Sequence, residues 1–179
     1  IPAPQLGGVA IKEAVKRAGI DPASVDEVLM GNVVSAGIGQ SPARQAAMAA
    51  GLPPTVGAMG ISKVCGSGLK AVMLGAGLIS AGDADIVVAG GMENMDLGPY
   101  LLAQGRTGYR LGHAQILDAT VHDGLWCAFQ NWHMGLAAEF IAQEFCITRQ
   151  MQDEFSYHSH QKAIKAMQNG WFKEEITPV

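Results

Sequence analysis

The stretch SKVCGSGLKAV at 62–72 places a single cysteine, Cys65, between an apolar run and a glycine-rich segment. Residues 56–64 predict a strand and the residues from Gly66 onward predict a helix, so Cys65 stands where the strand ends and the helix begins. At a helix amino end, unpaired N–H groups and the helix dipole stabilise an anion. Because Gly66 and Gly68 carry no side chain, a planar thioester could approach closely and backbone N–H groups could face its oxygen. The stretch therefore suggests a thiolate nucleophile that exchanges one thioester for another.

Three other interpretations fit the residues around Cys65. Free cysteine is often a small buried hydrophobe, and position alone does not decide between that role and catalysis. The letters GSGLKA at 66–71 match the dinucleotide fingerprint, but Asp83 and Asp85 precede the next predicted strand, whereas the fingerprint's acidic residue follows it. Ser67 as a hydrolase nucleophile requires G-x-S-x-G, and position 65 is cysteine. Packing and nucleophilic catalysis therefore stay open for Cys65, while the other two interpretations are disfavoured.

Composition limits the class of protein. The 179 residues include 23 glycines, and only 16% are charged, which favours a tightly packed α/β domain over a disordered chain. The formal net charge of −4, without a run of Lys or Arg, argues against a nucleic-acid partner or an anionic membrane. Three widely spaced cysteines without a Cys-x-x-Cys pair support neither a disulfide framework nor a zinc site, so we expect a reducing compartment.

Helices and strands alternate through the first half of the chain. Proline and glycine mark a helix at 4–18 and a second helix at 42–50, with Ser41 as its N-cap. Strands are predicted at 25–34, 56–64 and 85–89. This alternation predicts an α/β fold with a mainly parallel sheet.

The helix predicted at 66–82 is apolar on every face, with Lys70 as its only charge. A helix of this kind must be buried all round, and one sheet can cover only one of its faces. Its charge-free part, 71–82, is shorter than the roughly 20 residues that span a bilayer. We therefore expect a buried helix, no membrane partner, and additional structure over its remaining faces.

The regular hydrophobic pattern of the sequence ends after Asp96. Residues 97–132 contain glycines, aromatics and mixed charges without a sustained period, which predicts an excursion of loops and short elements. Helices follow at 135–145 and at 149–169, the second with Thr148 as N-cap and Gly170 as its stop.

The sequence resembles the thiolase family along essentially its whole length, and within that family its acetyl-CoA C-acetyltransferase branch. Five groups of residues carry the resemblance: KVCGSGLKA at 63–71, AGGMENM at 89–95, DGL at 123–125, HMG at 133–135 with Ala138-Glu139, and QDEF at 152–155 through EITP at 175–178.

The resemblance implies a reaction and its residues. Cys65 would accept the acyl group, with its backbone N–H in an oxyanion hole, and Leu125, His133 and Met134 would line the tunnel for the pantetheine arm and acyl group. The family reaction joins two acetyl-CoA into acetoacetyl-CoA and CoA, or runs in reverse, through an acetyl-cysteine. Coenzyme A thioesters are the substrates, and no further cofactor or metal is implied. HMG at 133–135 favours acetyl-CoA over longer chains.

The resemblance also implies an incomplete chain. Residues 1–95 would be most of the family's N-terminal α/β core without its first strand, and 96–179 would be part of the inserted loop domain. The histidine that activates the nucleophile, the second cysteine and the asparagine motif belong to the family's later half, so we expect this fragment to be inactive in the full cycle. A homodimer or homotetramer is implied, with 105–112 as a candidate subunit contact, and cytoplasm is the default location.

Residues near the motifs have simpler interpretations. Without the resemblance, His133 would be a helix-start histidine making a local hydrogen bond, and Met134 would belong to the core. Glu93-Asn94 is interpreted as a turn that closes a strand. His158 and His160 lie two apart on a helix and point to different faces, which argues against a shared metal.

The sequence departs from the family at Cys127, Asp96, Trp132 and Ser62, where aspartate, serine, tyrosine and asparagine are usual. The nucleophile is retained, so what the resemblance implies about Cys65 is unaffected, whereas the detailed shape of the implied tunnel does not carry over. Two alternative functions remain: a degradative 3-ketoacyl-CoA thiolase for longer chains, and a non-catalytic acyl-CoA-binding protein of the same fold.

Overall fold

A computed structural model describes every residue from Ile1 to Val179. The chain forms two compact units, residues 1–124 with the terminal Val179, and residues 125–178. Each unit is described by itself. From the sequence, a domain boundary is expected after residue 95, where the family's loop domain would begin. The division into compact units does not test that boundary, which stays a prediction.

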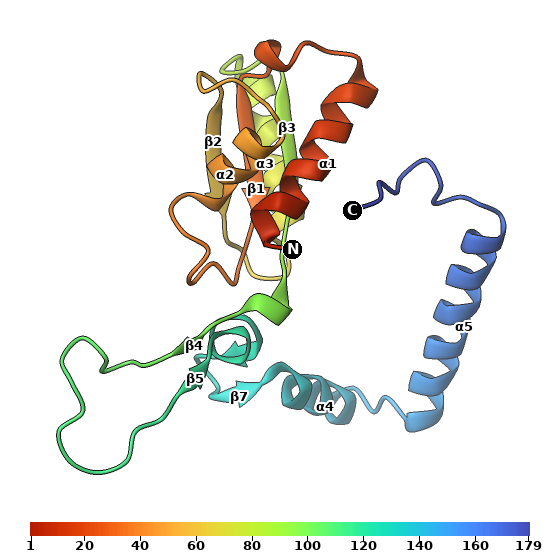
Figure 1. The fold of residues 1–179 in the computed structure, drawn as a ribbon. Coiled ribbons are helices and arrows are strands. Elements are labelled where there is room, and N and C mark those ends of the chain that lie inside the picture. Colours follow the sequence, from red (N-terminus) through yellow and green to blue (C-terminus); the bar gives the residue numbers. More distant parts are fainter. The chain divides into compact units, whose positions relative to one another are not determined.

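The first unit is built on a three-stranded parallel sheet in the order β2-β1-β3 (Figure 1). The strands are β1 (Glu27–Gly31), β2 (Gly57–Ile61) and β3 (Val87–Gly91). Glu27 lies between Gly57 and Val87 in the register, and Gly31 lies between Ile61 and Gly91. The predicted parallel α/β fold is confirmed.

Side chains hydrogen-bonded to the backbone fix where the strands begin and end. The carboxylate of Asp26 accepts from the N–H groups of Asp85 at 2.8 Å and Ile86 at 2.9 Å, so β3 begins two residues later than the sequence suggested. At the carboxyl end of β1, Glu93 accepts a hydrogen bond from Val33 N at 2.8 Å, and the strand ends at Gly31 instead of continuing to Val34.

Helices cover both faces of the sheet. α1 (Ala3–Ala18) and α2 (Pro42–Ala49) pack against each other, and their buried residues share one core with Val28 and Met30 of β1. Successive strand residues face opposite sides, so Leu29, 1% exposed, faces α3 (Ser67–Ala81), which contacts β1 and β3. The unit therefore has three layers.

Two helix ends test the predicted caps. Gly19 ends α1 in the left-handed conformation, as its position after Ala18 suggested. Ser41 stands directly before α2, but its φ is +50° and its side chain makes no capping hydrogen bond, so the prediction of a Ser41 cap is wrong in its chemistry. A short 3₁₀ helix, η1 (Pro22–Ser24), lies between α1 and β1.

α3 buries only the side that faces the sheet. Its buried residues are Ser67, Ala71 and Gly75, while Leu69 is 70% and Met73 57% exposed in this chain. A window from Val64 to Ala81, which includes Lys70, is long and apolar enough by composition to cross a membrane. Core helices of soluble proteins pass the same test, and Ala71 at 0% exposure packs on the sheet side, so this is weak evidence for a membrane span.

Short elements follow β3, as the irregular texture of the sequence predicted. A 3₁₀ helix η2 (Met95–Leu97) leads to an antiparallel pair, β4 (Tyr100–Leu101) with β5 (Leu117–Asp118), and then to the π-helical turn η3 (Thr120–Leu125).

The second unit contains another short antiparallel pair and two helices. β6 (Trp126–Cys127) pairs with β7 (Trp132–His133), and α4 (Met134–Glu144) and α5 (Arg149–Gln168) follow (Figure 1). Thr148 caps α5 as predicted, with its Oγ1 accepting from Met151 N at 3.3 Å.

Candidate active site

Cys65 lies in a tight turn between β2 and α3. β2 ends at Ile61, and α3 begins at Ser67 with Gly66 at the N-cap position. The thiol is free and exposed, so packing as a buried hydrophobe does not describe Cys65 in this chain. The first turn of α3 carries no acidic residue that would offset the positive end of the helix dipole.

The residue before Cys65 has an unusual backbone. Val64 has φ of +46°, in the left-handed region that β-branched residues avoid. Such a conformation costs about 1–3 kcal/mol and persists only where the surroundings enforce it. Strain of this kind often marks functional sites, and here it is adjacent to the candidate nucleophile.

Close backbone packing supports the start of α3. A Cβ placed on Gly31, the last residue of the central strand, would lie 2.7 Å from Gly68 N and 2.8 Å from the Ser67 side chain. Glycine at position 31 therefore lets the first turn of α3 sit directly on the strand. This contact ties the turn that carries Cys65 to the most buried part of the sheet.

The carboxyl ends of the strands also carry a polar cluster, formed by Asn32 after β1 and Glu93 after β3. Asn32 Nδ2 donates to Glu93 Oε1 at 2.7 Å, and Glu93 Oε2 accepts from Val33 N at 2.8 Å and Val34 N at 3.3 Å. Asn32 is 8% exposed, and its Oδ1 has no hydrogen-bond partner. Glu93 therefore has a structural role, as the sequence predicted, but its carboxylate joins two segments about 60 residues apart in the sequence and does not close a local turn. The role of Asn32 was missed, because nothing local to position 32 indicates a partner 61 residues away.

The residues expected to bind substrate belong to the second unit. Leu125 is half-buried at the end of η3, His133 ends β7, and Met134, 40% exposed, begins α4. His133 Nδ1 accepts from Gly135 N at 3.0 Å, so its ring caps α4. This is the local hydrogen bond that the simpler interpretation of His133 predicted. Within this unit, Trp126, the neighbour of Leu125, pairs with His133, and Met134 follows His133 directly. Cys65 belongs to the first unit.

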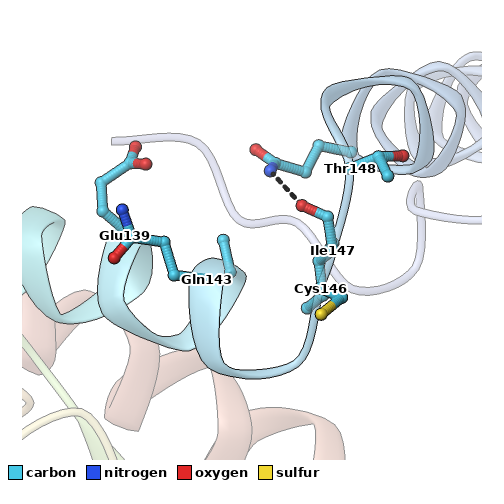
Figure 2. Close-up of a pocket in the computed structure, with 7 residues that line it drawn as sticks. Glu139, Gln143, Cys146, Ile147 and Thr148 are labelled. Carbon is cyan, nitrogen blue, oxygen red and sulfur yellow. Dashed lines mark hydrogen bonds between the residues drawn. The ribbon is translucent and has the colours of Figure 1, made fainter.

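The other two cysteines occupy different surroundings. Cys127 is half-buried in β6, and its Sγ accepts from Gln130 N at 3.4 Å. Cys146, with φ of +52°, lines a shallow hollow of about 380 Å³ where α4 connects to α5. Figure 2 shows this hollow, with Glu139 and Gln143 on α4. Gln152 Nε2, also in its lining, donates to Ile147 O at 3.3 Å. Neither thiol stands at a strand-to-helix junction like that of Cys65.

Comparison with known proteins matches the whole chain. The family described as "Thiolase, N-terminal domain" matches residues 1–179. An acetyl-CoA acetyltransferase of Pseudomonas aeruginosa is 53% identical, and one of Cupriavidus necator is 57% identical, each across all of this chain and 46% of that protein. An acetyl-CoA acetyltransferase of Escherichia coli is 55% identical across 97% of this chain and 44% of its own length.

The chain thus spans about half the length of the curated relatives that it matches. The match extends over every motif in which the sequence resembled the thiolases, from the turn around Cys65 to the C-terminal residues. The chain belongs to the thiolase family and corresponds to its N-terminal domain.

Proposed function

We propose that the complete protein is a thiolase that joins two acetyl-CoA into acetoacetyl-CoA and CoA, or runs the reverse thiolysis, through an acetyl group on Cys65. The observation that carries the proposal is the exposed, strained turn at Cys65, at the amino end of α3, in a chain of the thiolase family. The names of the bacterial relatives, acetyl-CoA acetyltransferases, support acetyl-CoA as the substrate.

The first half-reaction balances within this proposal. The thiolate of Cys65 attacks the carbonyl carbon of acetyl-CoA, a new sulfur–carbon bond forms, and the bond from that carbon to the sulfur of CoA breaks. CoA leaves as a thiolate, which takes a proton from the medium. The acetyl group stays activated because one thioester has replaced another.

The second half-reaction forms the carbon–carbon bond. A base removes a proton from the methyl carbon of a second acetyl-CoA, the resulting carbanion attacks acetyl-Cys65, and the bond to Cys65 sulfur breaks. By the family resemblance, the base and the groups that activate Cys65 come from residues outside this chain. We therefore propose that the 179-residue chain alone does not complete the cycle.

Leu125, His133 and Met134 are proposed to contact the pantetheine arm and acyl group of the substrate. His133 already caps α4, so its binding role needs a variant that keeps the cap. His133→Asn retains a side-chain acceptor at the N-cap and removes the imidazole, whereas His133→Ala removes both. A binding role predicts that both variants raise KM for acetyl-CoA. A capping role alone predicts that only His133→Ala has an effect.

Location and assembly are part of the proposal. Three free thiols suit a reducing compartment such as the cytoplasm, and the family resemblance suggests a homodimer or homotetramer. No group of three or more His, Cys, Asp or Glu side chains could hold a metal ion, and the proposed reaction uses the coenzyme A thioester alone.

The test is to incubate the full-length protein with isotopically labelled acetyl-CoA, quench with acid and map the label by peptide mass spectrometry. We expect acetyl on Cys65, none on Cys127 or Cys146, and no label in Cys65→Ser. Cys127→Ser is the matched control and should retain the label. A folded wild-type protein without an acetylated cysteine would instead be a non-catalytic acyl-CoA-binding protein.

A degradative thiolase for longer chains is the second candidate, because a Staphylococcus aureus relative at 49% identity bears the broader name probable acetyl-CoA acyltransferase. Cleavage rates compared across 3-ketoacyl-CoA chain lengths separate the two. Fastest cleavage at four carbons supports the acetoacetyl-CoA enzyme, and a maximum at longer chains supports the degradative one.

A further inference from the structure

We propose that Ser67 is a positioning residue for Cys65: its hydroxyl holds Val64 in the left-handed conformation and thereby sets the direction in which the Cys65 thiol is presented. This inference rests on the proposed function, in which Cys65 is the nucleophile. Ser67 itself does not touch the substrate in this proposal.

The Ser67 hydroxyl joins both sides of the turn. Ser67 Oγ donates to Val64 O at 2.7 Å and accepts from Lys63 N at 2.8 Å. Two backbone bonds run alongside, from Gly66 N to Lys63 O at 3.0 Å and from Ser67 N to Val64 O at 3.1 Å. Half of the hydrogen bonds that close this turn around Cys65 therefore pass through one hydroxyl.

Packing of the Val64 side chain does not explain its unfavourable backbone conformation. Its side chain is 52% exposed, so burial does not offset the left-handed conformation of a β-branched residue. The Ser67 hydroxyl bonds the carbonyl of Val64 and the N–H of the residue before it. Together with the backbone bond from Ser67 N to Val64 O, these two hydroxyl bonds are the hydrogen bonds that hold Val64 in this conformation.

Ser67 is in turn held by the core. It is 5% exposed, it begins α3, and its side chain lies against Gly31 of the central strand, where an added Cβ would come within 2.8 Å. A hydroxyl that is buried and engaged as both donor and acceptor is not available as a nucleophile. Ser67 thus packs against the central strand and hydrogen-bonds Val64, and in this proposal these contacts fix the position of the neighbouring Cys65.

The test removes the Ser67 hydroxyl and then asks whether a residue that adopts the left-handed conformation without strain at position 64 restores the reactivity of Cys65. Ser67→Ala removes both hydroxyl bonds, so Val64 is expected to leave the left-handed region and displace Cys65. Glycine adopts that region without strain, so Val64→Gly should retain the turn even without the hydroxyl. Val64→Ala shortens the same exposed side chain but keeps a Cβ, and it is the matched control.

The measurement is the single-turnover rate of acetyl transfer from acetyl-CoA to Cys65 in the full-length protein, at several acetyl-CoA concentrations, with thermal melting as the control for folding. We expect Ser67→Ala to lower the maximal rate about 10- to 100-fold, as for a misplaced reacting group, with an unchanged half-saturating concentration. Adding Val64→Gly should recover most of the rate, and adding Val64→Ala should not.

Each other outcome has a defined meaning. No acetyl on Cys65 in the wild type contradicts the proposed function itself. With an acetylated wild type, the inference is overturned if Ser67→Ala reacts at the wild-type rate, or if Val64→Ala rescues as well as Val64→Gly. If Ser67→Ala does not fold, the Val64→Gly double variant decides: rapid acetylation supports the inference, and a slow or unfolded double variant overturns it.

Discussion

Residues 1–124 and residues 125–178 both contain long helices, but they stabilise them in different ways. In the first unit, α1, α2 and α3 pack on a sheet whose central residues Val28 and Leu29 are 0% and 1% exposed. In the second unit, α4 has no buried residue and α5 has one, Ala166.

Local interactions take the place of a core in the second unit. His133 caps α4, Thr148 caps α5, and Arg149 pairs with Asp153 one turn later at 2.8 Å. Large apolar side chains such as Phe155 and Trp171 are 78% and 62% exposed in this chain. The comparison teaches that burial against a sheet stabilises the helices of the first unit, whereas within this chain the helices of the second unit rely mainly on local interactions.

Truncating a core residue should have the largest effect. Leu29→Ala removes a fully buried side chain between the sheet and α3, so we expect the free energy of unfolding of the chain to fall by about 2–5 kcal/mol. Phe155→Ala in α5 is the matched truncation and should change it by less than about 0.5 kcal/mol. Chemical denaturation followed by circular dichroism measures both. Equal losses would show that the second unit has a core after all.

The polar cluster at Asn32 should come next. Glu93→Gln replaces a carboxylate that accepts three hydrogen bonds with an amide that turns a donor toward one of them, and we expect a loss of about 1–3 kcal/mol. Glu154→Gln in α5 is the control, since Glu154 is 67% exposed and lies 3.9 Å from His158. Denaturation midpoints compare the two, and an unchanged midpoint for Glu93→Gln would contradict the structural role given to this cluster.

Caps reverse the comparison, because they matter more where a core is lacking. Thr148→Ala removes the bond from Met151 N to Thr148 Oγ1, and we expect α5 to lose about 1 kcal/mol of stability. Ser41→Ala is the matched change before α2, where the serine makes no capping bond, and it should be nearly neutral. Amide hydrogen exchange in the first turn of each helix reports both. A larger increase in exchange rate over wild type in α2 of Ser41→Ala than in α5 of Thr148→Ala would contradict this expectation.

Acid should affect the first unit through Asp26, and this is the smallest effect expected. Hydrogen bonds from the backbone of Ile86 and Asp85 lower the pKa of Asp26 below its ordinary value of 3.8. A lowered carboxyl pKa contributes stability that is present above pH 3.8 and is lost as pH falls through the folded value. We expect Asp26→Asn to flatten the pH dependence of the melting temperature below pH 4.

Asp153→Asn is the control for that measurement. Its ion pair with Arg149 is exposed, with 84% and 59% of the two side chains accessible, so its removal should leave the melting temperature unchanged. A flatter acid response in Asp153→Asn than in Asp26→Asn would mean that the exposed ion pair, and not the Asp26 carboxylate beside β3, sets the acid stability.

Local signals in the sequence were sufficient for much of the fold. Helix starts and stops at Gly19, Thr148 and Gly170, and the alternation of strands with helices, predicted the elements and their parallel arrangement. The predicted boundaries of α1, α3 and α5 were correct within about one residue. These features depend on residues within one or two helical turns of each other, and such information is written along the chain.

Tertiary structure decided how the candidate site is built. The sequence placed Cys65 between a strand and a helix, but the end of β2 at Ile61, the left-handed Val64 and the buried hydroxyl of Ser67 appear only once α3 sits on Gly31. Asn32 and Glu93 meet across 61 residues because parallel strands end at the same edge of a sheet. Contacts between distant residues depend on how the elements pack, and residue types and spacing along the chain do not specify that packing.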